Sequence, residues 1–577
     1  MSEAYEEPLP KSNRRTMLMG GVAAVLLGCC ALLFVVVTVV GLDPFGLNIF
    51  ARLTGRYDAA ATVMPADTGL YAGVNLLNLD SEEIGRLAQP FIEATGDPQV
   101  ENLDGAQSEL VEEIESGLGI NIETDVIPWI GQYLGFGITG FTFDNFGEVE
   151  SADWILAVEA RNRGAADEFL LKLRDGLADS SGNEITEQSY GGAALYVMQS
   201  GSPAEQIAFG RSGGLVILGA NLAAVQAAID AQDGDSLDES DNYRQIIGDL
   251  PRARALTIYT SGDEVREFLD QVGSTAPIPV NPDGLPIANF ASSATTFSIV
   301  EAGLQIDMVS YFDQEQLTAA QQALLEAAGQ PSETAEIFPD QTLAYMSGQR
   351  LDLLWLAIRE ATGDEVGFDE SMDAFGREFG VNPHTDLFPL LNGEWAIGLM
   401  AGQSGLLAEE LEVPLGFSLI AGTDRPQELA GTVEDIRSAL EGQLLTVREA
   451  TTDGRTGYEV SLSETAAPAF YFGLEQGYLF IASSEGAAVE TFTDGPTLAE
   501  SEQYQAVQAE FSRGINPALY LDVRALLGTF RESRAGLDLL DFNESVAFFE
   551  PIEAVALGNA YEGDLRRTQI IIFIETE

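Results

Sequence analysis

Hydrophobic residues along this chain form strand-like runs followed by helix-spaced stripes, and this series occurs twice. Residues 154–160 are typical of a strand in the first copy, as are residues 415–421 in the second. Apolar residues spaced as on one face of a helix then follow in both copies: Ala166, Phe169, Leu170, Leu173 and Leu177 in the first, and Leu429, Val433, Ile436 and Leu440 in the second.

Paired apolar runs around glycine turns predict hairpins in each copy. They lie at residues 206–210 with 214–219 and 296–300 with 305–312, and again at 469–473 with 477–483 and 554–560 with 568–574. Between the hairpins, Ser240 and Ser501 each precede an amphipathic helix as a suitable N-cap. Hairpins mixed with strand-helix pieces, without a regular βαβ alternation, favour an α+β fold with mainly antiparallel sheets.

An offset of 261 residues relates the two copies. Residues 119–128 read GINIETDVIP and residues 380–389 read GVNPHTDLFP. The offset returns at Leu237/Leu498, Ser240/Ser501, Tyr243/Tyr504 and Tyr259/Tyr520, so a whole unit is duplicated. We predict that Tyr243 and Tyr504 occupy matching, half-buried sites against the first turns of their helices.

The N-terminal part predicts a membrane anchor. Thr16 to Leu42 contains no charged residue and, at about 1.5 Å per helical residue, is long enough to cross a hydrocarbon layer roughly 30 Å thick. Lys11, Arg14 and Arg15 precede it, which favours a cytoplasmic N-terminus and export of the rest. We therefore predict a cytoplasmic tail at 1–15, a transmembrane helix at 16–42, a stalk at 43–62, and two α+β units at 63–330 and 331–577.

Two processing signals compete with an uncleaved anchor. Arg14-Arg15-Thr16-Met17-Leu18 loosely resembles a twin-arginine signal, and the run that ends at Cys29 loosely resembles a lipoprotein cleavage site. The apolar sequence continues to Leu42, where a cleaved lipoprotein would turn polar, so the anchor is favoured.

Composition removes several functional classes. The net charge of -63, from 91 acidic and 28 basic residues, repels nucleic acid, although dispersed acids can attract divalent cations or a basic envelope protein partner. Both cysteines, Cys29 and Cys30, lie in the predicted anchor, so the remainder holds no disulfide or cysteine metal site.

Three catalytic motifs lack their required context. Residues 210–214 match G-x-S-x-G around Ser212, but strands on both sides predict a hairpin turn, and the second copy has Glu475 at that position. Residues 135–140 match G-x-G-x-x-G but lead into a strand, not a helix. His384 is the only histidine, and we expect it to be a surface loop residue. No catalytic residue and no cofactor are predicted.

Four aspartates are weak candidates for metal ligands. Asp125 and Asp386 follow threonines in both copies and could ligate a hard cation, although an Asx-type turn is the favoured interpretation. Asp233 and Asp235 belong to the densest acidic cluster, which lacks the pattern of an EF-hand and is better interpreted as a solvated loop.

The motifs resemble those of a bacterial domain-of-unknown-function family, numbered 3352. The resemblance rests on the N-terminal span, the strand-helix after Trp154, and two motifs present in both copies. These are Pro-x-x-Thr-x-x-Tyr at Pro65 and Pro339, and Leu-x-x-Ser-x-x-Tyr at Leu237 and Leu498. It covers about residues 57–577 and implies a single-span envelope protein without an assigned reaction.

Three functional hypotheses follow. The first is a non-enzymatic protein in the cytoplasmic membrane, with its two units outside, for scaffolding or partner binding. The second is a carrier or sensor of an apolar ligand. The third is a hydrolase using two carboxylates across a cleft. The second is suggested by six aromatic residues: Phe136, Phe141, Phe143, Phe470, Tyr471 and Phe472.

Overall fold

The computed structural model describes residues 58–575 with several gaps. The gaps are 79–80, 96–114, 116–117, 144–148, 199–205, 253, 264–265, 267–289, 363–367, 403–407, 409–413, 442–444, 453, 462–467, 532–546 and 548. The predicted anchor at residues 16–42 lies outside the described part. Within that part, no helix combines the length and the apolar character needed to cross a membrane.

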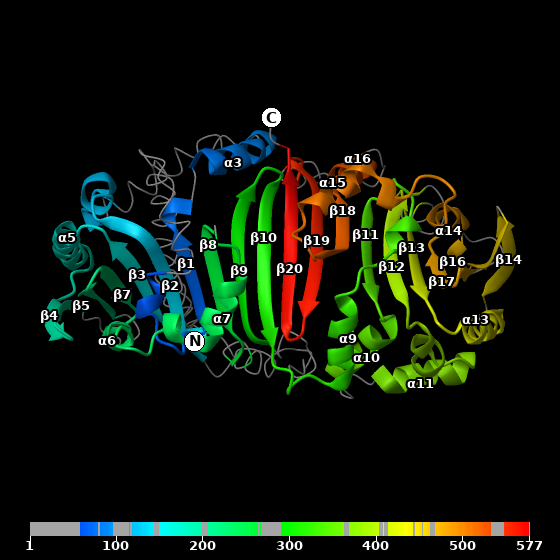
Figure 1. Cartoon of the computed structure of the whole chain (residues 1–577), viewed down its shortest axis with the longest axis horizontal. Helices are drawn as coiled ribbons and strands as arrows, with labels where there is room; N and C mark the ends of the chain where they lie inside the picture. The colour runs from blue at the N-terminus through cyan, green and yellow to red at the C-terminus, as the bar shows by residue number, and fades with distance from the viewer. Residues whose placement is uncertain are drawn as a thin grey trace, which may run out of the picture.

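A single sheet of twenty strands runs through the molecule, and all its pairings are antiparallel (Figure 1). The first half contributes β1 (Leu70–Asn75), β2 (Ile130–Phe143), β3 (Val149–Ala160), β4 (Ile185–Tyr190), β5 (Ala193–Met198), β6 (Ile207–Ser212), β7 (Leu215–Gly219), β8 (Leu256–Ser261), β9 (Phe290–Val300) and β10 (Gly303–Phe312). The second half contributes β11 (Ala344–Gln349), β12 (Glu394–Ala401), β13 (Leu415–Gly422), β14 (Thr446–Thr452), β15 (Arg455–Ser461), β16 (Pro468–Glu475), β17 (Tyr478–Ala482), β18 (Asn516–Asp522), β19 (Ile552–Glu562) and β20 (Leu565–Ile574).

The strand order is the same in both halves. It is 4-5-6-7-3-2-1-8-9-10 in the first half and, from the opposite end, 14-15-16-17-13-12-11-18-19-20 in the second. The expected α+β class with antiparallel pairing is therefore observed. The sequence predicts mainly antiparallel sheets within two units, whereas the structure has one sheet shared by both halves.

Helices cover both faces of this sheet. Tyr71, Tyr259, Tyr345 and Tyr520 point to one face, which we name the tyrosine face, and α6 and α7 pack there in the first half. Helix α5 packs on the opposite face with Trp129 and Phe209. The helices are α3 (Ser81–Thr95), α5 (Arg163–Ser181), α6 (Leu222–Ala231), α7 (Asp241–Asp249), α9 (Ala319–Ala328), α10 (Leu351–Thr362), α11 (Phe368–Phe379), α13 (Pro426–Glu441), α14 (Glu485–Thr491), α15 (Glu502–Glu510) and α16 (Val523–Arg531).

Strands β10 and β20, the last of each half, lie side by side at the centre of the sheet (Figure 1). Nine residue pairs join them, from Gly303↔Phe573 to Tyr311↔Leu565. Asp307 pairs with Gln569, which lies 262 residues later. The same offset relates Ala294 to Ala556, the partners of Tyr259 and Tyr520. The halves are therefore related by a two-fold axis through the Asp307–Gln569 pair, perpendicular to the sheet.

The duplicated tyrosines occupy matching sites. Tyr243 lies edge-on to Tyr259 with ring centroids 5.2 Å apart, and Tyr504 lies edge-on to Tyr520 at 5.3 Å. Tyr243 and Tyr504 are fully buried, not half-buried as predicted, because the neighbouring tyrosines enclose them.

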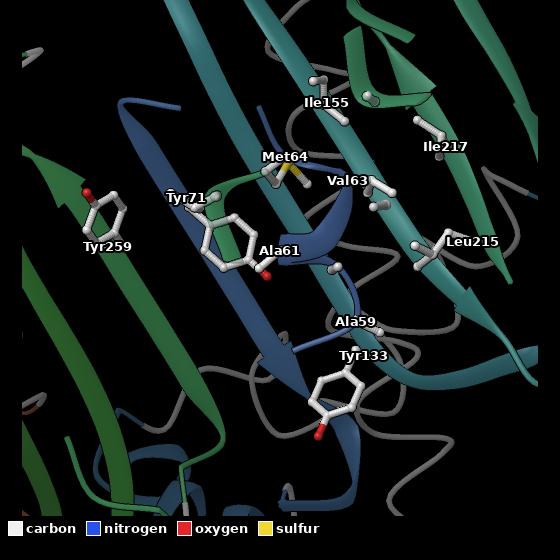
Figure 2. Packing of buried hydrophobic residues seen from close by; sticks show 14 of the residues in the cluster. Ala59, Ala61, Val63, Met64, Tyr71, Tyr133, Ile155, Leu215, Ile217 and Tyr259 are labelled. Atoms are coloured by element: carbon white, nitrogen blue, oxygen red, sulfur yellow. The ribbon is translucent and has the colours of Figure 1, made fainter. Parts of the chain in front are cut away.

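Residues 58–62, predicted as the end of the stalk, belong to the core. Ala59, Ala60 and Ala61 are buried in the same cluster as Tyr71. The short η1 helix (Ala61–Val63) places Val63 and Met64 in this cluster too (Figure 2). An alanine-rich segment without periodicity gives no sequence signal for this packing. The first unit therefore begins at least as early as Asp58.

Candidate functional site

Ser212 lies in a hairpin turn, as the sequence predicts. It ends β6, and Gly213, with φ of +58°, turns the chain into β7. The Ser212 hydroxyl is 3.1 Å from Gln232 Oε1. These contacts therefore give the Ser212 hydroxyl no basic partner of the kind that a catalytic serine needs.

The other two motifs also have structural roles. Gly135 and Gly137 lie inside β2, where a Cβ would come within 2.6 Å of Ala60 Cβ and Met64 Sδ respectively. His384 is half-buried, and its Nδ1 accepts a hydrogen bond from Trp355 Nε1 at 3.2 Å.

Asp125 and Asp386 close equivalent π-helical turns, η3 (Ile122–Val126) and η10 (Pro383–Leu387). The Asn121 N–H donates to Asp125 at 3.0 Å and the Asn382 N–H to Asp386 at 2.8 Å. A hydrogen bond from Lys172 lowers the pKa of Asp125. Asp233 and Asp235 lie in an exposed turn. Within the described ranges, no three acidic, histidine or cysteine side chains gather as a metal site.

A cavity of about 380 Å³ lies between α5 and the turns beside β5 and β6. The Arg211 guanidinium donates to both carboxylate oxygens of Asp167, at 2.6 and 2.8 Å, and to the Gly213 carbonyl at 2.7 Å. Asp167 is the one carboxylate among its lining residues. This cavity therefore lacks the acid pair that a carboxylate-based hydrolase needs.

Asp58 is a buried carboxyl group in the first half. Tyr71 Oη donates to its Oδ2 at 2.5 Å, and the Ala60 N–H donates to its Oδ1 at 3.0 Å. Burial raises the pKa of Asp58 to about 6, although both hydrogen bonds favour the charged form. The equivalent tyrosine, Tyr345, is bonded to the neutral Thr334 hydroxyl at 2.6 Å.

The aromatic residues suggested for apolar-ligand binding do not form one group. Tyr471 and Phe472 are buried in two different clusters, and Phe470 packs beside the second of these. Phe136 is half-buried, with its ring stacked near Trp154 at 6.3 Å. The side chains of Phe141 and Phe143 lie outside the described part.

The middle of the opposite face is apolar across both halves. Since side chains alternate along each strand, residues next to buried tyrosine-face residues point to the opposite face. We name the resulting set the central apolar surface. It consists of Phe297, Ile299, Leu304, Ile306, Met308, Leu519, Leu521, Val555, Leu557, Ile570 and Ile572, with Met346 at its margin.

This surface is not fully buried, unlike the cores on either side of it. Every member is partly exposed, and Met346 is 38% exposed. None belongs to, or packs against, the four buried clusters that the described residues form. A contiguous apolar patch of this kind is uncommon on a soluble monomer and marks binding of a ligand or partner.

One end of the opposite face is polar. There, Ser293 Oγ lies 2.9 Å from Ser310 Oγ, and Thr568 Oγ1 donates to Asn559 Oδ1 at 2.8 Å. Arg566 is on the same side of β20, two residues before Thr568. Thr568 and Ser310 are buried there, whereas Arg566 is partly exposed. Among the described strands, polar residues therefore border the apolar surface, and Arg566 is the charged residue of this border that reaches solvent.

Sequence reasoning missed this surface although a signal existed. The run Ile570 to Ile574 is apolar at every position, which means that both faces of β20 are apolar, whereas a half-buried strand alternates. The sequence predicts only the second strand of a hairpin at residues 568–574. Which strands stand beside β20 depends on pairing between residues far apart in the chain.

Comparisons with known sequences and structures yield few matches. No curated protein sequence matches the chain. Solved structures that resemble it include crystal forms I, III and IV of TP0453, each 6% identical, with TM-scores of 0.24, 0.24 and 0.22. The similarity covers 47%, 47% and 44% of this chain and 87%, 86% and 81% of those chains, and it supports no argument at these scores. The family model for "Protein of unknown function (DUF3352)" matches residues 19–575, so the chain belongs to the DUF3352 family.

Proposed function

We propose that this protein is a non-enzymatic, membrane-anchored extracytoplasmic protein that binds an apolar or amphipathic ligand on its central apolar surface. The anchor is the apolar sequence at residues 16–42, and the basic residues before it favour an exported C-terminal part. The observation that carries the ligand proposal is the partly exposed apolar surface that crosses the β10–β20 junction.

Binding of an apolar ligand explains this surface better than a scaffolding role in which the protein contacts partners through its charged residues. Apolar side chains on six neighbouring strands, β9, β10, β20, β19, β18 and β11, remain partly exposed to water. Covering them contributes about 25 cal/mol for each Å² removed from water. An apolar ligand supplies that cover without the exact shape that a protein partner needs.

Photo-crosslinking of the full chain tests the proposal. The probe is a long-chain fatty acid carrying a diazirine, applied to the protein held in an amphipathic polymer, with labelled peptides identified by mass spectrometry. We expect labels on β10, β19 and β20. The variant Ile306→Thr/Ile570→Thr keeps β-branched residues at two paired positions but lowers their hydrophobicity, so labelling should weaken on the order of tenfold.

A matched control is Leu171→Gln, since Leu171 is an exposed apolar residue on α5, 42% exposed and away from the central apolar surface. It should leave labelling unchanged. Labels scattered over other surfaces, or equal labelling of the double variant and the wild type, would contradict the proposal.

A further inference from the structure

Arg566 is a cation on a face that holds no acidic partner for it. We consider the residues of β8, β9, β10, β18, β19 and β20 that point to the opposite face and follow the regular strand alternation. Among them, Arg566 is the one charged side chain. Its neighbour Arg567 points to the tyrosine face and pairs with Asp249 at 2.9 Å.

The guanidinium of Arg566 keeps hydrogen-bonding capacity. One Nη donates to Asn559 Oδ1 at 3.2 Å, and the guanidinium carbon lies 5.7 Å from the centroid of the Tyr561 ring. Its Nε is buried and has no hydrogen-bond partner. Since a guanidinium has five N–H donors in a planar fork, these contacts leave donors for a carboxylate.

The arrangement along β20 is that of a site for an amphiphile. Its opposite-face residues run from Arg566 and Thr568 to Ile570 and Ile572, so charge and polarity at one end give way to apolar side chains. Six residues of strand span about 20 Å at 3.4 Å per residue, which accommodates an extended acyl chain.

The two-fold relation shows that this polarity is not required by the fold. At the offset of 262 residues, the counterparts of Arg566, Thr568, Asn559 and Tyr561 are Leu304, Ile306, Phe297 and Ile299. The first half therefore builds the same strands with apolar residues at all four positions. Among the described strand residues, this surface has one polar end, and it suits one ligand per chain.

We propose that the ligand is a long-chain fatty acid, whose carboxylate binds Arg566 and whose hydrocarbon chain lies on the central apolar surface. This inference rests on the proposed function. One positive charge matches a head group with one negative charge, and the planar fork of arginine matches the two oxygens of a carboxylate. Each methylene group removed from water adds to the binding free energy, so the length of the hydrocarbon chain sets the affinity. Arg566 sets the selectivity for the head group.

The test measures competition against the photo-crosslinkable probe by oleate and by methyl oleate, which share a hydrocarbon chain but differ in head-group charge. With the full wild-type chain, we expect oleate to compete at least about tenfold better, since a charge-assisted bond is lost in the ester. In Arg566→Gln the two competitors should become equal, and Arg566→Lys should retain part of the preference. The bound complex should contain one oleate per chain in native mass spectrometry.

The control Arg567→Gln removes a positive charge from the next position of the same strand but on the tyrosine face, so it should keep the preference for oleate. Equal competition by oleate and methyl oleate in the wild type would overturn the fatty-acid inference and leave the proposed function standing. Failure of both to compete, together with no labelling of the central apolar surface, would overturn both. The wild-type comparison decides the inference even if Arg566→Gln does not fold.

Discussion

At the scale of single residues, Asp58 is a carboxyl group whose charged form is disfavoured by its surroundings. It lies beside Ala60, Ala61 and Tyr71, and burial raises its pKa from 3.8 to about 6. The hydrogen bonds from Tyr71 and Ala60 offset only part of the desolvation cost. Asp58 therefore acts as a local source of pH-dependent stability.

Replacing Asp58 by asparagine should stabilise the protein at neutral pH. A raised carboxyl pKa gives stability that is complete below pH 4 and is lost as the pH rises through about 6. The difference between the two pKa values corresponds to about 3 kcal/mol. The unfolding free energy of Asp58→Asn, measured by urea unfolding, should thus exceed that of the wild type by up to that amount at pH 8 and match it near pH 4.

The control is Asp233→Asn, because Asp233 lies in an exposed turn. Its unfolding free energy should follow the wild-type pH profile. A wild type whose stability relative to Asp58→Asn did not fall between pH 4 and pH 7 would contradict a buried, poorly solvated Asp58.

At the scale of elements, the duplicated helices α7 and α15 differ in how they begin. The Ser240 hydroxyl accepts a hydrogen bond from the Tyr243 N–H at 3.3 Å, whereas Ser501 makes no side-chain cap hydrogen bond. Sequence reasoning treats both serines as caps because the residue type and its spacing are identical. Residue type and spacing do not determine whether the hydroxyl accepts this hydrogen bond.

Ser240→Ala should destabilise the protein by about 1 kcal/mol, the usual loss for an N-cap. Ser501→Ala should change the unfolding free energy by much less, since it removes no such bond. Denaturant unfolding of the two variants side by side measures this difference. Equal losses at both sites would show that Ser501 caps α15 in solution.

The sequence predicts those elements whose hydrophobic periods are clear. The predicted hairpins correspond to β6–β7, β9–β10, β16–β17 and β19–β20, and the predicted helices to α5, α7, α13 and α15. The edge strands β4 and β14 escape prediction. Their sequences, ITEQSY and TVREATT, are mostly polar, because an edge strand with little burial does not need an apolar face.

At the scale of the whole molecule, the sequence interpretation of two separate units is incomplete. Each half has its own buried clusters, but the edge of β10 is occupied by β20. Side-chain contacts cross the same line: Gln569 Nε2 donates to Asp307 at 2.9 Å, and Arg567 pairs with Asp249. Hydrophobic periodicity describes each strand alone and does not say which distant strand will pair with it.

The halves should stay together after the chain between them is cut. A protease site inserted at residues 329–333, between α9 and the η8 turn (Thr334–Glu336), would separate them covalently. Because nine residue pairs join β10 to β20, we expect the fragments to co-elute in gel filtration of the cleaved full chain.

The variant Arg567→Ala/Gln569→Ala removes both side-chain contacts and should lower the urea concentration at which the cleaved halves part. Fragments that eluted separately without denaturant would show that the peptide connection, and not the strand pairing, holds the halves together.

The pair at the two-fold axis bears on the ancestry of this chain. In a homodimer of an ancestral single unit, joined through its last strand, symmetry would place the same residue on both sides of the axis. Two aspartates there would repel each other, and two glutamines could not form the Asp307–Gln569 bond seen here. A bond between two different residues at the axis is therefore open to a single chain that carries both copies, and closed to a symmetric homodimer of one copy.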